Sequence, residues 1–389
     1  MIRHFSADFI IPVSGGPIKD GIVSVDDTGR VVNLAGSEDP GAGTIKRFKG
    51  IIVPGFVNTH CHLELSHLAG KIPGGNGLIP FLSAVMAKRT ADHRDILEAM
   101  ELADKAMQEN GIVAVGDISN NSLSKTIKRE SPIHYHTFVE FIGFDPQNAE
   151  AILNRSIEIL KEFEPLPASL APHAPYSVSK ALLKLLRKNT TGSYKLTSMH
   201  NQESDEENKL YRYKTGKYID FYKSLNLNID FFKPHARNSI QSLLPLFSSE
   251  QRILLVHNTF TNLKDIYFAR RMDQDVHWCF CPKANLYLEK KLPVIEMFLS
   301  ENFNITLGTD SLASNDKLCI LSELKTIKKY FPSLSFTETI PWATLNGAKF
   351  LGVDDKYGSI EKGKTPGLNL ISNTEGLELT ALSHVRKLV

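Results

Sequence analysis

Apolar and polar positions follow two different patterns along this chain. Up to residue 53, short runs such as 5–13 and 21–25 alternate or stay apolar, and turn-forming residues separate them. This pattern predicts a small β unit. From about residue 60, short apolar runs instead alternate with longer segments whose apolar residues have helical spacing. Strands that alternate with helices indicate βαβ units and parallel pairing.

Helical spacing is clearest over residues 92–110, which Gly111 follows as a stop signal. The other expected helices span residues 149–163, 180–188, 239–247, 263–272 and 294–298. Strands are expected over residues 112–117, 136–143, 169–173, 194–200, 252–257, 276–281 and 304–310. Together with a strand that ends at His60, these segments predict eight parallel strands.

Most of these strands end in a histidine or an aspartate. The strand ends fall at His60, Asp117, Phe141, His173, His200, His257, Cys281 and Asp310. Eight β/α units close a barrel, and the catalytic groups of such barrels sit at the C-terminal ends of the strands. The sequence has no glycine-rich phosphate loop that would support an open doubly wound sheet. We therefore expect an α/β fold, a distorted (β/α)8 TIM barrel.

Strand-like signals return in the C-terminal tail. Residues 357–364 predict a turn-rich β segment, and residues 368–371 predict a strand. The simplest assembly pairs this tail with the N-terminal β unit, so that both chain termini form a small β-sandwich beside the barrel. The expected domains are residues 1–53 and 346–389 for the two parts of the sandwich, and residues 54–345 for the barrel.

Composition limits the classes of partner. The chain has 389 residues, of which 42% are hydrophobic and 23% charged, and its net charge is +2. This balance argues against nucleic acid or a membrane as the main partner, and no stretch reads as a signal peptide or a membrane span. Four cysteines are too few for a disulfide framework in a chain of this length. We expect a cytoplasmic protein.

Candidate chemistry begins with the His60-Cys61-His62 motif. Residues i and i+2 of a strand project to the same face, so both imidazoles can reach one cation. Imidazole suits zinc and similar metals. Taken alone, two such histidines can also be neighbours by chance. His200, His257 and Asp310 each end a later strand, and their convergence at one barrel mouth favours a metal site.

Two other motifs could imitate a metal site. His134 and His136 have the same spacing, but they precede the apolar run of their strand, so we expect them at the opposite end and interpret them as structural. Cys279 and Cys281 lack the spacing of the zinc deaminase signature and read as buried small apolar residues.

Several motifs along nearly the whole chain are typical of one family. They are PGFVNTHCH (54–62), APHAPYSVS (171–179), HNQE (200–203), LVHN (255–258), CPKAN (281–285), LGTDS (307–311) and GSIEKGK (358–364). In these motifs the chain resembles the amidohydrolase superfamily, in its cytosine deaminase-like, chlorohydrolase-like branch. The tail departs slightly, because Pro366-Gly367 stands where that family usually has Ala-Asp. This departure affects the sandwich and not the site.

The resemblance implies one divalent metal ion, with zinc expected and iron as the alternative. The implied ligands are His60, His62, His200 and Asp310. Binuclear members use a carboxylated lysine at the end of strand 4, where this chain has no lysine, so we expect a mononuclear site. The implied catalytic residues are Glu203, His257 and Asp310, and the implied substrate contacts are His173, Glu64, Phe81 and Ser311.

These roles imply a deaminase. The metal would activate water, Asp310 and His257 would accept its proton, and Glu203 would protonate a ring nitrogen before ammonia leaves. The expected substrate is a small molecule with an exocyclic amine on an N-heteroaromatic ring, such as a purine base, a nucleoside or a pyrimidine. Two alternatives stay open at this point. One is hydrolysis of a C–Cl, amide or cyclic imide bond, and the other is a barrel that binds without catalysis.

Specificity is expected from the loop after the first barrel strand and from an aromatic-rich insertion over residues 204–249. In the first loop, Glu64, Ser66, Phe81, Val85 and Arg89 resemble the corresponding stretch of aminodeoxyfutalosine deaminases, which makes aminodeoxyfutalosine a candidate substrate. A homodimer is the assembly considered.

Overall fold

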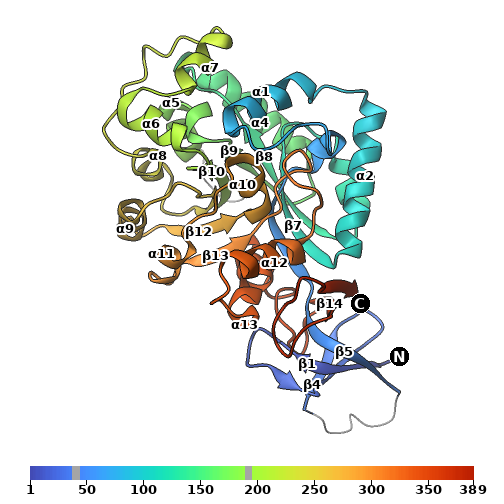
Figure 1. The fold of residues 1–389 in the computed structure, drawn as a ribbon. Helices are drawn as coiled ribbons and strands as arrows, with labels where there is room; N and C mark the ends of the chain where they lie inside the picture. Colours follow the sequence, from blue (N-terminus) through green and yellow to red (C-terminus); the bar gives the residue numbers. More distant parts are fainter. Residues whose placement is uncertain (37–43, 189–194) are drawn as a thin grey trace.

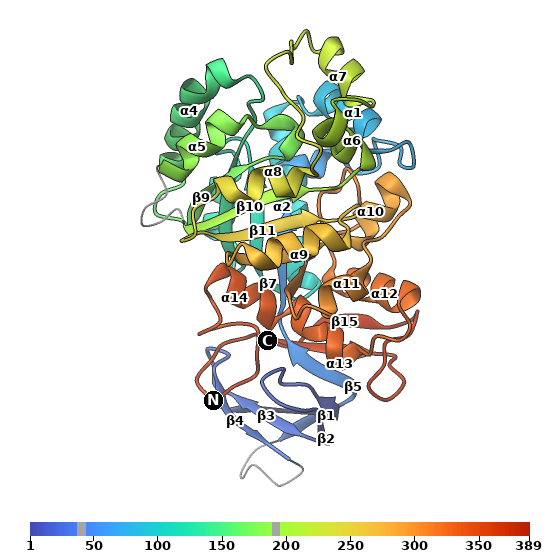
Figure 2. The same ribbon diagram turned by 90° about the vertical axis from the view of Figure 1, so that its left-hand side faces the viewer.

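The computed structural model describes residues 1–36, 44–188 and 195–389. Eight parallel strands in chain order form the body of the molecule, as two four-stranded sheets (Figures 1 and 2). The first sheet contains β6 (Phe56–Cys61), β7 (Ile112–Ser119), β8 (His134–Phe141) and β9 (Ala168–Pro172). The second contains β10 (Leu196–Asn201), β11 (Arg252–His257), β12 (Asp275–Phe280) and β13 (Asn304–Leu307). The predicted eight-strand α/β architecture is confirmed, although the strands divide into two sheets.

The two sheets meet along two edges. Between β9 and β10, the His200 N–H donates to the His173 carbonyl at 2.9 Å. Between β13 and β6, the Thr309 and Asp310 N–H groups donate to the His60 carbonyl at 3.0 and 3.1 Å, and Cys61 and Asp310 form a parallel bridge. The last strand, β13, therefore lies beside the first, β6. At both places where the two sheets meet, the hydrogen-bond ladder between the strands is interrupted.

Buried apolar side chains from several strands fill the common interior. They include Val57, Ala114, Ile118, Phe138, Ala171, Leu254, Val256 and Cys279. Alternation explains this set, because every second side chain of a strand points inward. Cys279 and Cys281 are both fully buried, as expected.

The helices follow the predicted segments closely. The expected ones are α2 (His93–Glu109), α4 (Ala149–Glu162), α5 (Lys180–Lys188), α8 (Ser239–Leu243), α9 (Leu263–Arg271) and α11 (Ile295–Leu299). The helix α2 begins where the Asp92 side chain accepts the Arg94 N–H, and it buries Ile96, Met100 and Met107. The helix α8 is shorter than expected and continues as the 3₁₀ turn η5 (Leu244–Leu246), because Pro245 has no N–H to donate.

Further elements connect the strands or cover their ends. They are η1 (Leu63–Leu68), α1 (Leu78–Lys88), α3 (Lys125–Glu130), η2 (Pro146–Asn148), η3 (Pro175–Ser177), α6 (Asp205–Tyr213), α7 (Tyr218–Ser224), α10 (Pro282–Glu289), α12 (Ile320–Tyr330), α13 (Phe336–Thr339), η6 (Ile340–Ala343) and α14 (Leu345–Leu351). Among the helices of the described residues, none combines the length and the apolarity that crossing a bilayer requires.

Two predicted strands differ at their ends. The strand expected to reach Asp310 stops at Leu307, because a side chain on Gly308 would lie 2.7 Å from the His60 Cβ and the backbone must approach there. Tyr194, the predicted start of another strand, lies outside the described residues, and β10 begins at Leu196.

Both termini join one small sheet at the end of the molecule opposite α1 and α7 (Figure 1). Its strands are β1 (Arg3–Ile10), β2 (Ile18–Lys19), β3 (Ile22–Val25), β4 (Val31–Ala35), β5 (Ile45–Pro54), β14 (Leu368–Ser372) and β15 (His384–Lys387). The predicted pairing of the tail with the N-terminal unit occurs between β14 and β5. Within the described residues the seven strands form a single sheet, where we expected two facing layers.

The tail segment 357–364 forms turns, where we expected a β segment. It lies beside β4 through a hydrogen bond from the Val31 N–H to the Lys364 carbonyl at 2.8 Å. Gly358 and Gly363 have positive φ angles, which occur in several turn types and interrupt an extended strand. The domain boundaries stay predictions, and residues 54 and 345 lie at the end of β5 and the start of α14.

Candidate active site

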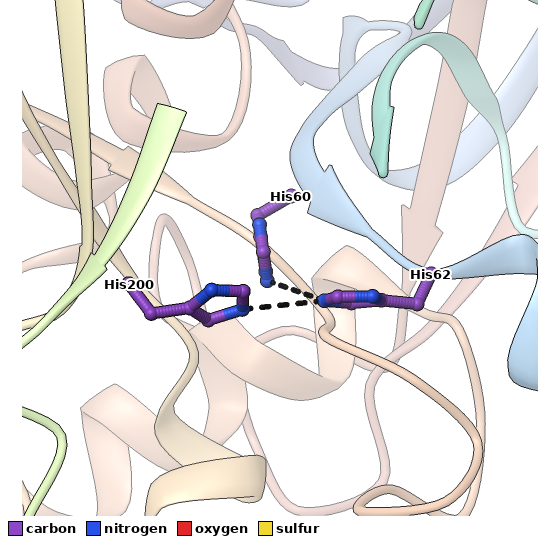
Figure 3. A group of neighbouring side chains, drawn as sticks. All are labelled: His60, His62 and His200. Atoms are coloured by element: carbon purple, nitrogen blue, oxygen red, sulfur yellow. Dashed lines mark hydrogen bonds between the residues drawn. The ribbon is translucent and has the colours of Figure 1, made fainter. Parts of the chain in front are cut away.

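The four predicted metal ligands converge at the C-terminal ends of β6, β10 and β13. The Nε2 atom of His62 lies 3.2 Å from the Nε2 of His60 and 3.3 Å from the Nε2 of His200 (Figure 3). The Asp310 Oδ1 atom lies 3.6 Å from the Nε2 of His60 and 3.5 Å from that of His62. All four residues are buried, and they come from segments up to 250 positions apart.

These distances fit one divalent ion. Donors that bind zinc tetrahedrally at about 2.0–2.1 Å are separated from each other by about 3.3 Å. The Nε2 of His62 faces two other imidazole nitrogens at nearly this distance, and a single ring proton cannot bridge to both of them. A cation among the four donors satisfies them together. Neutral imidazoles with one carboxylate are also the donor types that zinc prefers.

Neighbouring groups prepare the imidazoles for this role. The Nδ1–H of His200 donates to the His173 carbonyl at 2.7 Å, which leaves the lone pair on Nε2 for a metal. Burial lowers the pKa of His62 and of His200 well below their ordinary value, so both rings are neutral near pH 7. Neutral imidazole is the form that binds metals.

The fourth donor, Asp310, is ionised. Burial alone would raise the pKa of its carboxyl, but the hydrogen bond with His60 and the nearby His62 and His257 rings outweigh burial and hold the pKa below its usual range. The Asp310 Oδ2 atom also accepts a hydrogen bond from the Ser314 hydroxyl at 2.5 Å. The carboxylate is therefore held in place from the side away from the imidazoles.

Glu203 and His257 lie next to this group. The Glu203 Oε1 atom is 3.5 Å from the His257 Nε2, and the other ring nitrogen, Nδ1, contacts the Asn285 Oδ1 at 2.8 Å. Burial raises the pKa of Glu203 well above its ordinary value and lowers that of His257 to about 4. A carboxyl whose protonated form burial favours therefore faces a neutral imidazole, which suits proton transfer.

Two of these residues have unusual backbone conformations. His257 has a φ of 72° and Asp310 a φ of 57°, in the left-handed region that side chains disfavour. His257 is the last residue of β11, and Asp310 lies three residues beyond the end of β13. Strain of this kind concentrates at functional sites.

A cavity of about 380 Å³ opens above the donors, and α1, η3 and α7 contribute to its wall. Its polar floor contains His62, His173, His200, Glu203, His257 and Asp310. Its upper wall is mostly apolar, with Leu78, Phe81, Leu82, Val85, Met86, Ile142, Phe144, Phe221, Leu225 and Leu227. The volume and the mix of apolar walls with a few polar groups suit a small organic molecule.

The predicted substrate contacts do not all reach this cavity. His173, Phe81 and Ser311 line it, whereas Glu64 does not. The Glu64 carboxylate instead accepts the Asn120 N–H at 2.9 Å and contacts the Arg89 guanidinium at 3.3 Å, behind the wall. The sequence could not decide this, because the side of η1 on which Glu64 lies depends on packing against the second barrel strand.

Sequence reasoning missed Glu140. It lies on β8, lines the cavity, and its Oε2 atom accepts a hydrogen bond from the Asn120 side-chain amide at 2.9 Å. Burial raises its pKa to about 7. A carboxylate inside the apolar run 138–141 was the signal that could have found it. The second paired-histidine motif, in contrast, lies at the start of β8, at the end of the strand opposite the site. There the His136 Nε2 atom lies 2.8 Å from the Ser169 hydroxyl.

Comparisons with known proteins identify the family of this chain. The family model described as the amidohydrolase family matches residues 51–387, so the chain belongs to the amidohydrolase family. The resemblance inferred from the motifs is thus confirmed. Fold, family and donor set together define a metal-dependent hydrolase that acts on carbon–nitrogen bonds other than peptide bonds.

Two curated relatives are deaminases. An adenosine deaminase from Helicobacter pylori is 27% identical over 332 residues, which cover 84% of this chain and 80% of that protein. An aminodeoxyfutalosine deaminase from Nitratiruptor sp. is 28% identical over 352 residues, which cover 87% of this chain and 83% of that protein. The solved structure of Helicobacter pylori aminofutalosine deaminase in complex with methylthio-coformycin matches with a TM-score of 0.80 at 24% identity, covering 97% of this chain and 93% of that one. The similarity to this solved structure supports the fold.

Proposed function

We propose that this protein is a deaminase of adenine nucleosides, which replaces the exocyclic amine of the purine ring with oxygen and releases ammonia. The observation that carries the proposal is the pair of Glu203 and His257, 3.5 Å apart and buried beside four convergent donors at the floor of an apolar cavity. Deaminases among the relatives support the same reaction.

His60, His62, His200 and Asp310 would hold one divalent ion, and zinc is the ion we propose. Such an ion lowers the pKa of water toward ~7 and so makes a nucleophile available at neutral pH. Zinc suits the tetrahedral spacing of these donors, and iron is the alternative.

The residues of the chain would then move protons. His257, a neutral base, and the Asp310 carboxylate accept the proton of the attacking water and orient its oxygen. Glu203, whose protonated form burial favours, donates its proton to the ring nitrogen next to the attacked carbon. The proton taken from water then reaches the leaving amine, the C–N bond breaks to release ammonia, and the second water proton, left on the added oxygen, returns to Glu203 as the C=O bond forms. His173 holds the substrate from the cavity wall.

The apolar wall suggests which nucleosides fit. A free 5′-hydroxyl pointed at Phe81, Val85 and Phe221 would lose its hydrogen bonds with water, which costs about 1–3 kcal/mol. We therefore propose that the substrate is an adenine nucleoside whose 5′ carbon carries a substituent with apolar surface, and aminodeoxyfutalosine stays a candidate through the resemblance of the loop after the first barrel strand.

Ammonia release tests the proposal. The zinc-loaded protein should release ammonia from adenosine, 5′-methylthioadenosine or aminodeoxyfutalosine, with kcat/KM at least tenfold higher for the 5′-apolar compounds than for adenosine. Guanine and cytosine serve as controls and should react poorly. Chloride release from a chlorotriazine without ammonia release from any adenine nucleoside would instead favour the C–Cl hydrolase, and no turnover at all would favour a binding protein.

Three broader predictions belong with this proposal. The four cysteines are all buried as free thiols, which suits a reducing compartment such as the cytoplasm. A homodimer is the assembly we propose, and light scattering of the purified protein would test it. Small molecules, not nucleic acids, are the proposed partners, given the net charge of +2.

A further inference from the structure

A buried carboxylate contacts the backbone directly after one of the proposed metal ligands. The Asp117 Oδ1 atom, near the end of β7, accepts the Leu63 N–H at 2.8 Å. Leu63 follows His62 and is the first residue of η1. The Asp117 side chain is 0% exposed, and it takes no part in the proton transfers described above.

A buried lysine completes the Asp117 contact. The Lys128 Nζ atom, on α3, lies 2.6 Å from the second carboxylate oxygen of Asp117 and is also 0% exposed. It donates further hydrogen bonds to the Ser119 and Thr137 hydroxyls at 2.9 and 3.0 Å. The rings of Tyr135 and Phe163 flank it at 5.7 and 5.1 Å. A charged pair taken entirely out of water is costly unless its hydrogen bonds are met, and here they are.

The hydrogen bond between Asp117 and the Leu63 N–H bears on the metal site, because Leu63 directly follows His62. The first N–H groups of a helix have no partner within the helix, and the His62 side chain does not cap η1. Asp117 supplies the missing acceptor from the neighbouring strand. The backbone turns at His62, with φ −123° and ψ 80°, so the hydrogen bond one residue later holds the angle at which the imidazole leaves the chain.

We propose that Asp117, held by Lys128, is a positioning residue for His62, and that its hydrogen bond to the Leu63 N–H strengthens metal binding without touching the metal. The inference rests on the metal site of the proposed function. Partners that orient metal ligands typically contribute 10–100-fold to metal affinity.

Two double variants of the full-length protein isolate the hydrogen bond. Asp117→Asn/Lys128→Met removes both charges but keeps a side-chain oxygen that can accept the Leu63 N–H. Asp117→Leu/Lys128→Met removes the same charges and also the acceptor. The dissociation constant for zinc is measured on each metal-free protein by competition with a chromogenic chelator, and the melting temperature of each metal-free protein is recorded.

The asparagine variant should bind zinc within about threefold of the wild type, and the leucine variant 10–100-fold more weakly. If the leucine variant does not fold, Asp117→Ala/Lys128→Met, which is smaller and also lacks the acceptor, should show the same loss. Equal zinc affinity in the wild type and the acceptor-free variants would overturn the proposal. An equal loss in the asparagine variant would overturn it as well, because the charges and not the acceptor would then matter.

A control separates positioning from loss of stability. Tyr135→Phe removes a buried hydrogen bond of 2.6 Å to Asp104, close to Lys128 but without a link to Leu63. Its melting temperature should fall while its zinc affinity stays unchanged. A wild type that binds no zinc would refute the metal site and the inference together, whereas a zinc-binding wild type with unaffected variants would refute the inference alone.

Discussion

Burial sets the protonation states on which the proposed chemistry depends. The carboxyl of Glu203 lies among apolar and acidic groups, so its charged form is disfavoured and its pKa rises, while burial lowers the pKa of His257 to about 4. In water near neutral pH, the carboxyl of a glutamate would be ionised. The imidazole of a histidine would be a mixture of its protonated and neutral forms. Exclusion of water by neighbouring side chains is therefore part of the mechanism at the residue scale.

Glu203→Gln should abolish most turnover and keep the metal. Glutamine has a similar shape but cannot donate and recover a proton, so kcat should fall by at least ~10²-fold, the lower end for general acid–base groups. Ammonia release under substrate saturation and metal content by elemental analysis measure the two effects.

Glu289→Gln is the matched control for this change. The Glu289 Oε1 atom accepts the Leu78 N–H at 2.8 Å, and the amide oxygen of glutamine can do the same. This variant should keep the turnover of the wild type. Near-wild-type rates in Glu203→Gln would contradict the role given to Glu203.

At the scale of elements, the insertion after β10 forms part of the cavity roof. The Tyr211 hydroxyl on α6 donates to the Pro175 carbonyl at 2.7 Å, and the Tyr222 hydroxyl on α7 donates to the Tyr176 carbonyl at 2.6 Å. Both acceptors belong to η3, close to His173. These two hydrogen bonds join the insertion to the wall beside the proposed substrate contact.

The first helix of the insertion also makes stability depend on pH. Burial raises the pKa of Glu207, on α6, from 4.5 to about 8. Between these values the folded protein holds a proton that the unfolded chain has released. The free energy of unfolding should therefore fall as pH rises through this window, by up to about 1.4 kcal/mol per pH unit. Glu207→Gln should flatten this fall, which urea unfolding at pH 5.5 and 7.5 would measure.

Glu206→Gln provides a neighbouring control. Its side chain is partly exposed, and hydrogen bonds with Lys209 and the Lys217 N–H lower its pKa, so it titrates below the tested window. That variant should keep the pH dependence of the wild type. A Glu207→Gln protein with the same fall in stability as the wild type would show that Glu207 ionises normally.

At the scale of the whole molecule, the proposed metal ligands lie beside both edges where the two sheets meet. The His200 N–H donates to the His173 carbonyl between β9 and β10, and the Asp310 N–H donates to the His60 carbonyl between β13 and β6. An ion bound to His60, His200 and Asp310 would therefore link the two sheets across interrupted ladders.

Removal of the metal should lower the melting temperature, and added zinc should restore it. Zinc at about 1,000 times its dissociation constant stabilises the folded state by about 4 kcal/mol through mass action. Thermal unfolding with a chelator and with excess zinc measures this difference. His200→Ala should lose the zinc-induced shift, whereas His134→Ala, at the opposite end of the strands, should keep it. An unchanged melting temperature in the wild type would speak against a bound ion at this place.

Local sequence patterns determined the order of strands and helices and the identity of the convergent donors. Side chains alternate along a strand, so His60 and His62 had to share a face, and polar residues that end parallel strands had to meet at one edge. These features depend only on short-range geometry and on the family motifs, and the structure brings the predicted donors together.

Only the tertiary structure decided the contacts that depend on distant segments. It placed Glu64 behind the cavity wall, Glu140 in it, and Asp117 against the Leu63 N–H, and it joined the terminal strands in one sheet. Each of these outcomes follows from how separate segments pack and exclude water from one another. A local pattern cannot show them, because the free energy of such contacts belongs to pairs of residues far apart in the chain.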